Sequence, residues 1–508
     1  MSSKIFSAGT IGLDAQIIEV EADIGGGQAG QFPIVGLPDT AVQEAKERVW
    51  SAIKNSGLDF RRERIVVNLA PADLRKEGPS YDLPIALSLI MAAGLLTINE
   101  SDKQAIYVGE LALDGRLRSI NGVLPVALMV KEKKLSRLYL PEENAKEAAL
   151  IEDIEIVPVK NLLQLFEHLT GSNIIEPYKS ETEAIATIEQ NFEMDMAFVK
   201  GQEHAKRALE IAASAGHNVL MSGPPGSGKT LLARALTTIL PPMTKNEILE
   251  VTKIYSVAGK LTADKPLIIE RPFRSPHHTS SGVALVGGGT YPRPGEISLA
   301  HKGVLFLDEL PEFPRLVLEN LRQPLEDGVV TVSRAQGTIT FPARFTLIAS
   351  QNPCPCGYYS DPDRECICTP TQILKYQKRI SGPLLDRIDL HIEVPRVKFD
   401  KLTSDQLSEP SEKIRARVKA ARDRQIFRFK NLKISTNAEM GAKEIREFCR
   451  INAQTQELLK NAVQQLKLSA RGYHRILKVS RTIADLAGAE NIELPHVAEA
   501  LQYRTKVE

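Results

Sequence analysis

Residues 218–239 read NVLMSGPPGSGKTLLARALTTI, and this stretch predicts the fold of the region around it. An apolar run typical of a buried strand leads into the pattern G-x-x-x-x-G-K-T, and a helix-forming run follows at once. Glycines let the backbone wrap so that its N–H groups face phosphate oxygens, and the helix N-terminus adds positive potential. The order strand, glycine-rich turn and helix therefore predicts an α/β domain that binds nucleotide phosphates.

The residues expected to surround the phosphates come directly from this pattern. The Lys229 amine would reach the β- and γ-phosphates of ATP, and the Thr230 hydroxyl would ligate Mg²⁺. The predicted phosphate-binding residues are Gly223, Pro224, Pro225, Gly226, Ser227, Gly228, Lys229 and Thr230.

Two acids follow a second apolar strand in residues 303–309, which read GVLFLDE. Asp308 would hold Mg²⁺, and Glu309 would activate the attacking water as a general base. An ordinary buried strand that ends in exposed acids is the alternative. The occurrence of the pair in the same region as the phosphate loop favours ATP hydrolysis.

Asn352 and Arg387 are two further candidate residues of the nucleotide site. A third apolar strand, residues 345–350, is followed by Gln351 and Asn352, and an amide at that place would orient the water beside the γ-phosphate. Residues 382–389 read GPLLDRID and place Arg387 at a turn. An ion pair between this arginine and its flanking aspartates is the alternative to a role in the site.

The composition is that of an ordinary globular chain. Its 508 residues predict three or four domains at ~150 residues each. With 43% hydrophobic and 25% charged residues, collagenous and wholly disordered chains are excluded. Lys and Arg total 64 against 63 Asp and Glu, a formal net charge of +1, so any polyanion site must be local.

Targeting signals and disulfides are not expected. The N-terminus has no continuous apolar region, and the most apolar stretch, residues 83–96, is shorter than the ~20 residues of a spanning helix. Five cysteines are too few for a disulfide scaffold. These features predict a soluble, cytoplasmic protein with no membrane partner.

The chain divides into segments of different pattern. In residues 1–170, β-like runs at 17–21, 65–69, 106–111 and 137–141 alternate with helices, including one over 39–54 with Asp39 or Thr40 as its cap. A polar, acidic linker is expected at 171–196, a second α/β region at 197–398, a basic helical connector at 399–435 and an all-helical region at 436–508. The fold class is therefore α/β with a helical C-terminal part.

Four of the cysteines fall within fifteen residues: Cys354, Cys356, Cys366 and Cys368. The spacing C-x-C, nine residues, C-x-C departs from the usual C-x₂₋₄-C, but four thiolates this close would satisfy a tetrahedral structural Zn²⁺. A loop of free thiols is the alternative. Cys449 lies in a helical pattern and is expected in the core. The neighbouring His277 and His278 are interpreted as polar loop residues whose rings point apart.

Residues 412–433 hold nine Lys or Arg and two acids, a local net charge of +7, with two phenylalanines between them. Such a helix would bind a phosphate backbone, or it would simply be a solvated connector. Residues 331–341 read as a hairpin that precedes the third strand.

Taken together, GPPGSGKT, VLFLDE, Asn352, LLDRIDL and SARGYHRILKVSRTIADLA resemble the AAA+ ATPases. The segment RPFRSPHHTSSGVALVGGGTYPRPGEISLAHKGVLFLDELPEF is similar to the YifB/ComM family of magnesium chelatase-like proteins, and the resemblance covers nearly the whole chain. It implies an αβα core, a helical lid at 436–508 and a hexameric ring with ATP sites between subunits.

The resemblance also implies roles for single residues. Asn352 matches sensor 1, Arg387 the arginine finger that completes a neighbour's site, and Arg471 sensor 2, with Arg475 as the competing choice. A finger of this kind is worth ~10³–10⁵ in rate. In related ring helicases the hairpin reaches into the channel, so Arg334 is the candidate DNA contact. The implied activity is DNA branch migration in recombination or natural transformation, on single-stranded or branched DNA.

The N-terminal domain resembles the Lon protease domain. Residues 71–87, PADLRKEGPSYDLPIAL, are similar to its serine loop and place Ser80 at the nucleophile position. The position of the Lon lysine, nine residues after Gly115, holds Leu124. The lysines that follow, Lys131, Lys133 and Lys134, are expected several helical turns away. A serine without a general base is a poor nucleophile, so the domain is expected to serve in ring assembly or DNA engagement rather than proteolysis. The alternatives for the whole chain are the ATPase subunit of a metal chelatase and an ATP-dependent serine protease.

Overall fold

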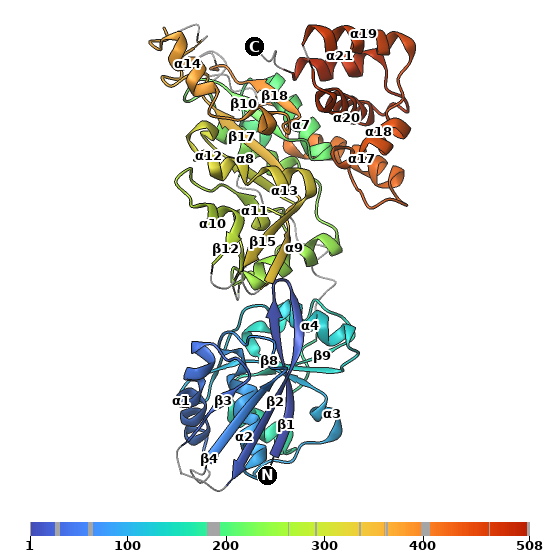
Figure 1. The fold of residues 1–508 in the computed structure, drawn as a ribbon. Helices are drawn as coiled ribbons and strands as arrows, with labels where there is room; N and C mark the ends of the chain where they lie inside the picture. The colour runs from blue at the N-terminus through green and yellow to red at the C-terminus, as the bar shows by residue number, and fades with distance from the viewer. Residues whose placement is uncertain are drawn as a thin grey trace. The chain divides into compact units, whose positions relative to one another are not determined.

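The computed structural model describes residues 2–25, 31–58, 64–179, 194–262, 264–289, 292–334, 337–359, 361, 364–397, 407–466 and 468–504. The chain forms two compact units (Figure 1). Unit 1 comprises Met1–Glu189 and Lys245–Ile269, and unit 2 comprises Gln190–Thr244 and Glu270–Glu508. The middle part of the predicted linker, residues 180–193, lies outside the described residues.

Unit 1 is a mixed sheet covered by helices. Its seven strands have the order β3-β4-β2-β1-β5-β8-β9, antiparallel from β4 to β1 and parallel elsewhere. The strands of unit 1 are β1 (Ser2–Ile11), β2 (Asp14–Gly25), β3 (Ile34–Val35), β4 (Arg64–Ala70), β5 (Ile106–Tyr107), β6 (Glu110–Leu111), β7 (Leu117–Arg118), β8 (Arg137–Pro141) and β9 (Glu155–Val159). Its helices are α1 (Thr40–Asn55), α2 (Asp82–Ala92), α3 (Glu100–Lys103), α4 (Val123–Glu132), α5 (Ala145–Ala148), α6 (Leu162–Leu169) and α9 (Lys245–Val257).

Local sequence signals account for most of these elements. The carboxylate of Asp39 caps α1 by accepting the Val42 N–H at 2.8 Å, as predicted. The expected strand at residues 106–111 is instead two short strands. Between them the Gly109 N–H donates to the Ser80 carbonyl at 2.9 Å, and the Gly109 carbonyl accepts from Leu83 at 3.1 Å. The serine loop therefore interrupts the strand by competing for its backbone groups.

The segment Lys245–Ile269 belongs to unit 1, although by residue number it lies inside the predicted ATPase region. Helix α9 packs on α4, and the Ser256 carbonyl accepts the Gly122 N–H at 3.2 Å. The Ser256 hydroxyl also donates to the buried carboxylate of Glu147. The chain therefore passes between the two units three times.

Unit 2 contains a five-stranded parallel sheet of order β11-β14-β17-β10-β18. Its strands are β10 (Val219–Ser222), β11 (Phe273–Arg274), β12 (Gly287–Gly288), β13 (Arg293–Pro294), β14 (Val304–Leu307), β15 (Val329–Arg334), β16 (Gly337–Pro342), β17 (Thr346–Gln351) and β18 (Leu390–Glu393). Its helices are α7 (Glu203–Ala215), α8 (Lys229–Ile239), α10 (Gly282–Val286), α11 (Glu296–Leu299), α12 (Arg315–Glu319), α13 (Arg322–Asp327), α14 (Pro370–Gln377), α15 (Gly382–Leu385), α17 (Ser411–Arg428), α18 (Ala442–Phe448), α19 (Ala453–Gln465), α20 (Ala470–Leu486) and α21 (Leu494–Gln502).

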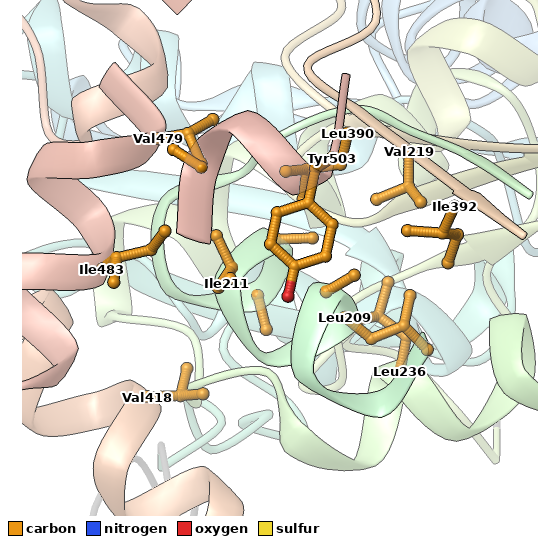
Figure 2. Close-up of a cluster of buried hydrophobic side chains, with 14 of the residues drawn as sticks. Leu209, Ile211, Val219, Leu236, Leu390, Ile392, Val418, Val479, Ile483 and Tyr503 are labelled. Carbon is orange, nitrogen blue, oxygen red and sulfur yellow. The ribbon is translucent and has the colours of Figure 1, made fainter. Parts of the chain in front are cut away.

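One hydrophobic core joins the sheet of unit 2 to its C-terminal helices. Figure 2 shows the ring of Tyr503 among side chains from the sheet, from α7 and α8, and from the C-terminal helices. Only 1% of Tyr503 is exposed, and its carbonyl accepts the His391 N–H at 2.9 Å. The α/β class with a helical C-terminal part is thereby confirmed. Within the described residues, no helix has the length and apolar character needed to cross a membrane.

A buried ion pair holds unit 1 together beside the serine loop. The Asp82 side chain has no exposed surface and accepts two bonds from the Arg48 guanidinium, at 2.8 and 3.0 Å. It also accepts the Leu111 N–H at 3.2 Å. Burial raises the pKa of Asp82 to about 6, although Arg48 opposes that rise.

Replacement of Arg48 by alanine is expected to lower the free energy of unfolding of unit 1 by ~3–5 kcal/mol, because it leaves a buried carboxylate unpaired. The loss should be larger at pH 8 than at pH 5. The folded-state pKa of Asp82 lies above its unfolded value and rises further without Arg48, so its contribution is best at low pH and is lost as the pH rises. Fluorescence of Trp50, the only tryptophan and packed on this core, follows the unfolding.

Arg116→Ala is the matched control, because Arg116 pairs with Asp114 at 2.7 Å while three quarters of its side chain is exposed. Its effect should stay below ~1 kcal/mol. Equal losses from the two variants would contradict the assigned importance of the buried pair.

Candidate functional site

The phosphate loop of unit 2 leaves the carboxyl end of β10 and enters α8 at Lys229. Gly226 and Gly228 have φ angles of +75° and +92°, which side chains other than glycine rarely adopt. Gly223 is required for space, because a Cβ there would lie 2.2 Å from the carbonyl oxygen of Val394. The glycines of the pattern therefore occupy positions where a side chain would strain or block the backbone.

Lys229 is buried at the base of this loop. Its amine donates to the carbonyls of Gly223 at 2.7 Å and Pro224 at 2.9 Å. It also contacts the side-chain oxygen of Asn352 at 3.4 Å. Burial lowers the pKa of Lys229, and the charge of Asp308 opposes that shift. The structure thus brings together the predicted lysine and the predicted sensor amide.

The two predicted acids lie at the end of β14, next to the loop. The Thr230 hydroxyl donates to Asp308 Oδ2 at 3.2 Å, so the two predicted Mg²⁺ ligands are adjacent. Ser350 on β17 donates its hydroxyl to Asp308 and accepts the Glu309 N–H at 3.1 Å. Glu309 has a φ angle of +53°, an uncommon conformation that turns the chain sharply after the strand.

His278 is a contact of the predicted base that sequence reasoning missed. Its Nδ1 lies 3.6 Å from Glu309 Oε2. The rings of His277 and His278 lie 4.1 Å apart between centroids, so the expectation that they point apart is wrong. Their segment precedes α10, and no spacing rule in the sequence connects it to Glu309.

Arg387 and Arg471 share one carboxylate, that of Glu326 on α13. Arg387 is 6% exposed, donates to the Pro383 carbonyl at 2.7 Å and pairs with Glu326. Arg471 donates to the other oxygen of Glu326 at 3.2 Å and keeps 56% of its side chain exposed. Arg387 pairs here with a residue sixty-one positions earlier, not with the flanking aspartates of the sequence alternative.

Arg475 has a different environment from Arg471, one turn earlier on α20. It pairs with Asp389, of which 4% is exposed. Burial alone would raise the pKa of Asp389, but Arg475, His217 and the N–H of Asn218 hold that pKa well below its usual range. Arg475 therefore attaches α20 to the sheet, whereas Arg471 remains accessible.

The basic stretch of α17 makes internal contacts. Arg415 donates to the Thr238 carbonyl at 2.8 Å, Arg417 pairs with Glu210 at 2.6 Å, and Arg428 bonds to Asp485 at 2.8 Å. These contacts favour the connector over a phosphate-binding helix. Residues 399–406 of the predicted connector lie outside the described residues.

The predicted hairpin is present as β15 and β16, paired from Val329–Pro342 to Arg334–Gly337. The side chain of Arg334 lies outside the described residues, so its role as a DNA contact stays a prediction.

The four cysteine sulfurs form one cluster and no disulfide. All lie within 4.8 Å of one another, with Cys354 to Cys356 at 3.3 Å and Cys354 to Cys366 at 3.7 Å. Backbone groups donate toward sulfur, among them the Tyr359 N–H to Cys354 at 3.3 Å and the Cys368 N–H to Cys366 at 3.4 Å. Sulfurs bound to a zinc at ~2.3 Å lie ~3.8 Å apart, so the cluster fits a tetrahedral ion.

In unit 1 the predicted nucleophile position and the position of the Lon lysine lie in different elements. Ser80 lies in a short 3₁₀ helix, Pro79–Tyr81, and Leu124 is buried on α4. Lys131 pairs with Asp153 at 3.0 Å on the surface. Lys76 is a buried lysine that sequence reasoning missed, and its amine donates to the Pro71 carbonyl.

Comparison with known proteins extends these observations to the whole chain. Three family models match: "Magnesium chelatase, subunit ChlI" at residues 195–402, "Subunit ChlI of Mg-chelatase" at 20–144, and the ChlI C-terminal model at 408–504. The chain is 45% identical over 510 residues to competence protein ComM of Haemophilus influenzae, covering 99% of this chain and 97% of that protein. It is 43% identical to the uncharacterized protein YifB of Escherichia coli, over 99% of this chain and 97% of the relative.

A more distant similarity is confined to one part of the chain. Lon protease of Azorhizobium caulinodans is 25% identical over 151 residues, covering 27% of this chain and 17% of that protease. This partial similarity agrees with the resemblance of the N-terminal region to the Lon protease domain.

Arg475→Ala should destabilise the attachment of α20 by ~3–5 kcal/mol, because Asp389 would keep a buried negative charge without its guanidinium partner. Arg471→Ala should cost less than ~1 kcal/mol, because its ion pair with Glu326 is half exposed. Hydrogen exchange of the amides in α20 and β18 measures both losses. Equal protection in the two variants would contradict this distinction.

Proposed function

The chain belongs to the YifB/ComM family of magnesium chelatase-like AAA+ ATPases, and from that premise we propose that it is an ATP-driven motor acting on DNA. The proposed activity is branch migration in recombination or natural transformation, by a hexameric ring. The observation that carries the proposal is the joining of Lys229, Thr230, Asp308 and Asn352 in one site, in a chain similar over its length to a protein named for competence.

The described contacts support separate roles for the residues of the site. Backbone N–H groups of the phosphate loop and the Lys229 amine bind the phosphates, and the amine exchanges its loop carbonyls for phosphate oxygens. Thr230 and Asp308 hold Mg²⁺, which when bound neutralises charge on the β- and γ-phosphate oxygens. Glu309 accepts a proton from the attacking water, and Asn352 orients that water.

The arginines supply the interaction between subunits in this proposal. Arg387 acts as the finger on a neighbour's ATP and Arg471 as sensor 2, since Arg475 is committed to buried Asp389. Glu326 holds both arginines within one chain, so both must exchange that carboxylate for phosphate charge when a ring forms. The carboxylate thereby keeps two cations paired until a nucleotide is in place.

Zinc is the metal proposed for the four cysteines. The thiolate sulfurs lie at distances that fit a tetrahedral ion, and four protein ligands leave no open position for catalysis. The proposed role is therefore structural.

Two alternatives remain as outcomes of experiment. The three matching family models are named for a chelatase subunit, which favours the ATPase of a metal chelatase as second candidate. Stimulation by a chelatase partner and not by DNA would support it. The Lon-like serine loop raises proteolysis as a third candidate, which casein degradation abolished by Ser80→Ala would support.

Lys229→Ala is expected to lose nucleotide affinity, because it removes the only side-chain amine at the base of the phosphate loop among the described contacts. Glu309→Gln should bind ATP with the parent affinity and hydrolyse it at least ~10²-fold more slowly, the usual size of a general-base effect. Fluorescent-nucleotide titration and phosphate release measure the two properties. Parental turnover in both variants would show that the site is assigned wrongly.

DNA should stimulate the ATPase, and the protein should move the branch point of a synthetic Holliday junction only when ATP is present. Electrophoresis of the labelled junction products measures branch migration, with Glu309→Gln as the control that binds ATP without rapid turnover. An ATPase that no DNA structure stimulates, on a junction that stays in place, would exclude the proposed motor.

A further inference from the structure

The cysteine cluster lies in the loop that joins β17 to α14, and this loop has little structure of its own. None of its described residues between Gln351 and Pro370 belongs to a helix or strand. Among those residues Cys354 is the one buried hydrophobic side chain, and Ile367 is 86% exposed. A loop without an apolar core depends on a cross-link for its shape, and a metal bound by its cysteines supplies one.

The first arm of this loop, residues 354–357, lies against Pro225 of the phosphate loop. A Cβ added to Gly357 would lie 2.6 Å from Cδ and 2.8 Å from Cγ of Pro225, and 3.9 Å from Cγ of Asn352. The Gly357 N–H donates to the Cys354 carbonyl at 3.0 Å, so the cysteine turn sets the position of this glycine. Only a residue without a side chain fits between the cluster and the phosphate loop.

The second arm of this loop, residues 366–369, leads into α14, and this part of the chain contacts segments beside Asn352 and Glu309. Cys368 is followed by Thr369, which caps α14. From α14 the side-chain amide of Gln377 donates to the carbonyl of Pro353, the residue after Asn352, at 3.5 Å. Burial raises the pKa of Tyr376 on the same helix, and the Asn352 N–H opposes that rise. Beyond the helix, Arg379 pairs with Glu312 at 2.8 Å, in the turn that follows Glu309. The two arms that the cysteines join therefore contact the phosphate loop, the sensor amide and the turn after the predicted base.

We propose that a zinc ion on Cys354, Cys356, Cys366 and Cys368 supports the nucleotide site, by holding Gly357 against Pro225 and α14 against Asn352. The inference rests on the ATP and zinc sites of the proposed function. Loss of zinc then weakens nucleotide binding before any unfolding of the sheet, although no cysteine touches the nucleotide loop's lysine or acids in the described contacts.

The test uses the full chain, with zinc measured by mass spectrometry and affinity by titration of fluorescent ADP. Cys366→Ser with Cys368→Ser should lose zinc and weaken ADP binding at least ~10-fold, about 1.4 kcal/mol. Ile367→Ala, between the same cysteines but exposed, should keep both zinc and affinity. Circular dichroism should show that the secondary structure and melting of the double variant remain close to the parent's.

A second variant separates the contact from the metal. Gly357→Ala should keep zinc yet weaken ADP binding, because its Cβ meets the proline ring. Adding Pro225→Ala should recover part of the affinity, since it removes the ring carbons that are met. Recovery of this kind is not expected from a general loss of stability.

The outcomes are distinct. Parental ADP affinity in the zinc-free variant, or in Gly357→Ala, would overturn the proposed support while leaving the ATPase intact. A parent that binds ADP but contains no zinc would overturn the metal site and the support together. A parent that holds zinc but binds no nucleotide would refute the ATPase proposal, and with it the support.

Discussion

The buried carboxylate of Asp389 is the group on which the architecture of unit 2 depends. It accepts the Asn218 N–H at 3.0 Å, lies 3.5 Å from His217 and pairs with Arg475. A charge removed from water is tolerated only where such partners surround it. The start of β10, the start of β18 and helix α20 must therefore come together. The Asn218 side chain extends the connection by accepting the Leu347 N–H of β17 at 2.9 Å.

The contacts of Asp389 fix the amino-terminal ends of the strands, and the functional residues lie at the opposite, carboxyl-terminal ends of these strands. Because β10, β14 and β17 are parallel and in register, the chain leaves all three strands on one side. Thr230 and Asp308 meet there across 78 residues, and Lys229 and Asn352 across 123. Ser350, near the end of β17, donates to the Asp308 carboxylate and accepts the backbone N–H of Glu309. The site is thus a consequence of strand direction, with short side-chain contacts determining its details.

The predictable part of the fold and site is the part carried by local patterns. The phosphate loop, the apolar strands and the Asp39 cap follow from neighbouring residues, because backbone conformation and burial act over a few positions. The partners of Glu326 and His278 could not be predicted, because each contact joins distant segments whose approach depends on the completed sheet. The same reason explains α9, a helix with an ordinary pattern whose packing in unit 1 no local signal indicates.

The low net charge of the chain limits how strongly one copy can bind a polyanion such as DNA. The most basic helix, α17, directs Arg415, Arg417 and Arg428 to carbonyls and carboxylates of its own unit. These three cations could face a DNA backbone only by giving up their internal contacts, and the chain as a whole carries a net charge of only +1. Phosphate affinity grows with the number of cations that face the backbone. A single nearly neutral chain therefore offers few cations to DNA. Several copies arranged in the proposed ring would together present a larger number of cations to the DNA backbone. The requirement connects the proposed DNA activity to assembly: one copy would bind DNA weakly, and the field needed to hold it would arise with the oligomer.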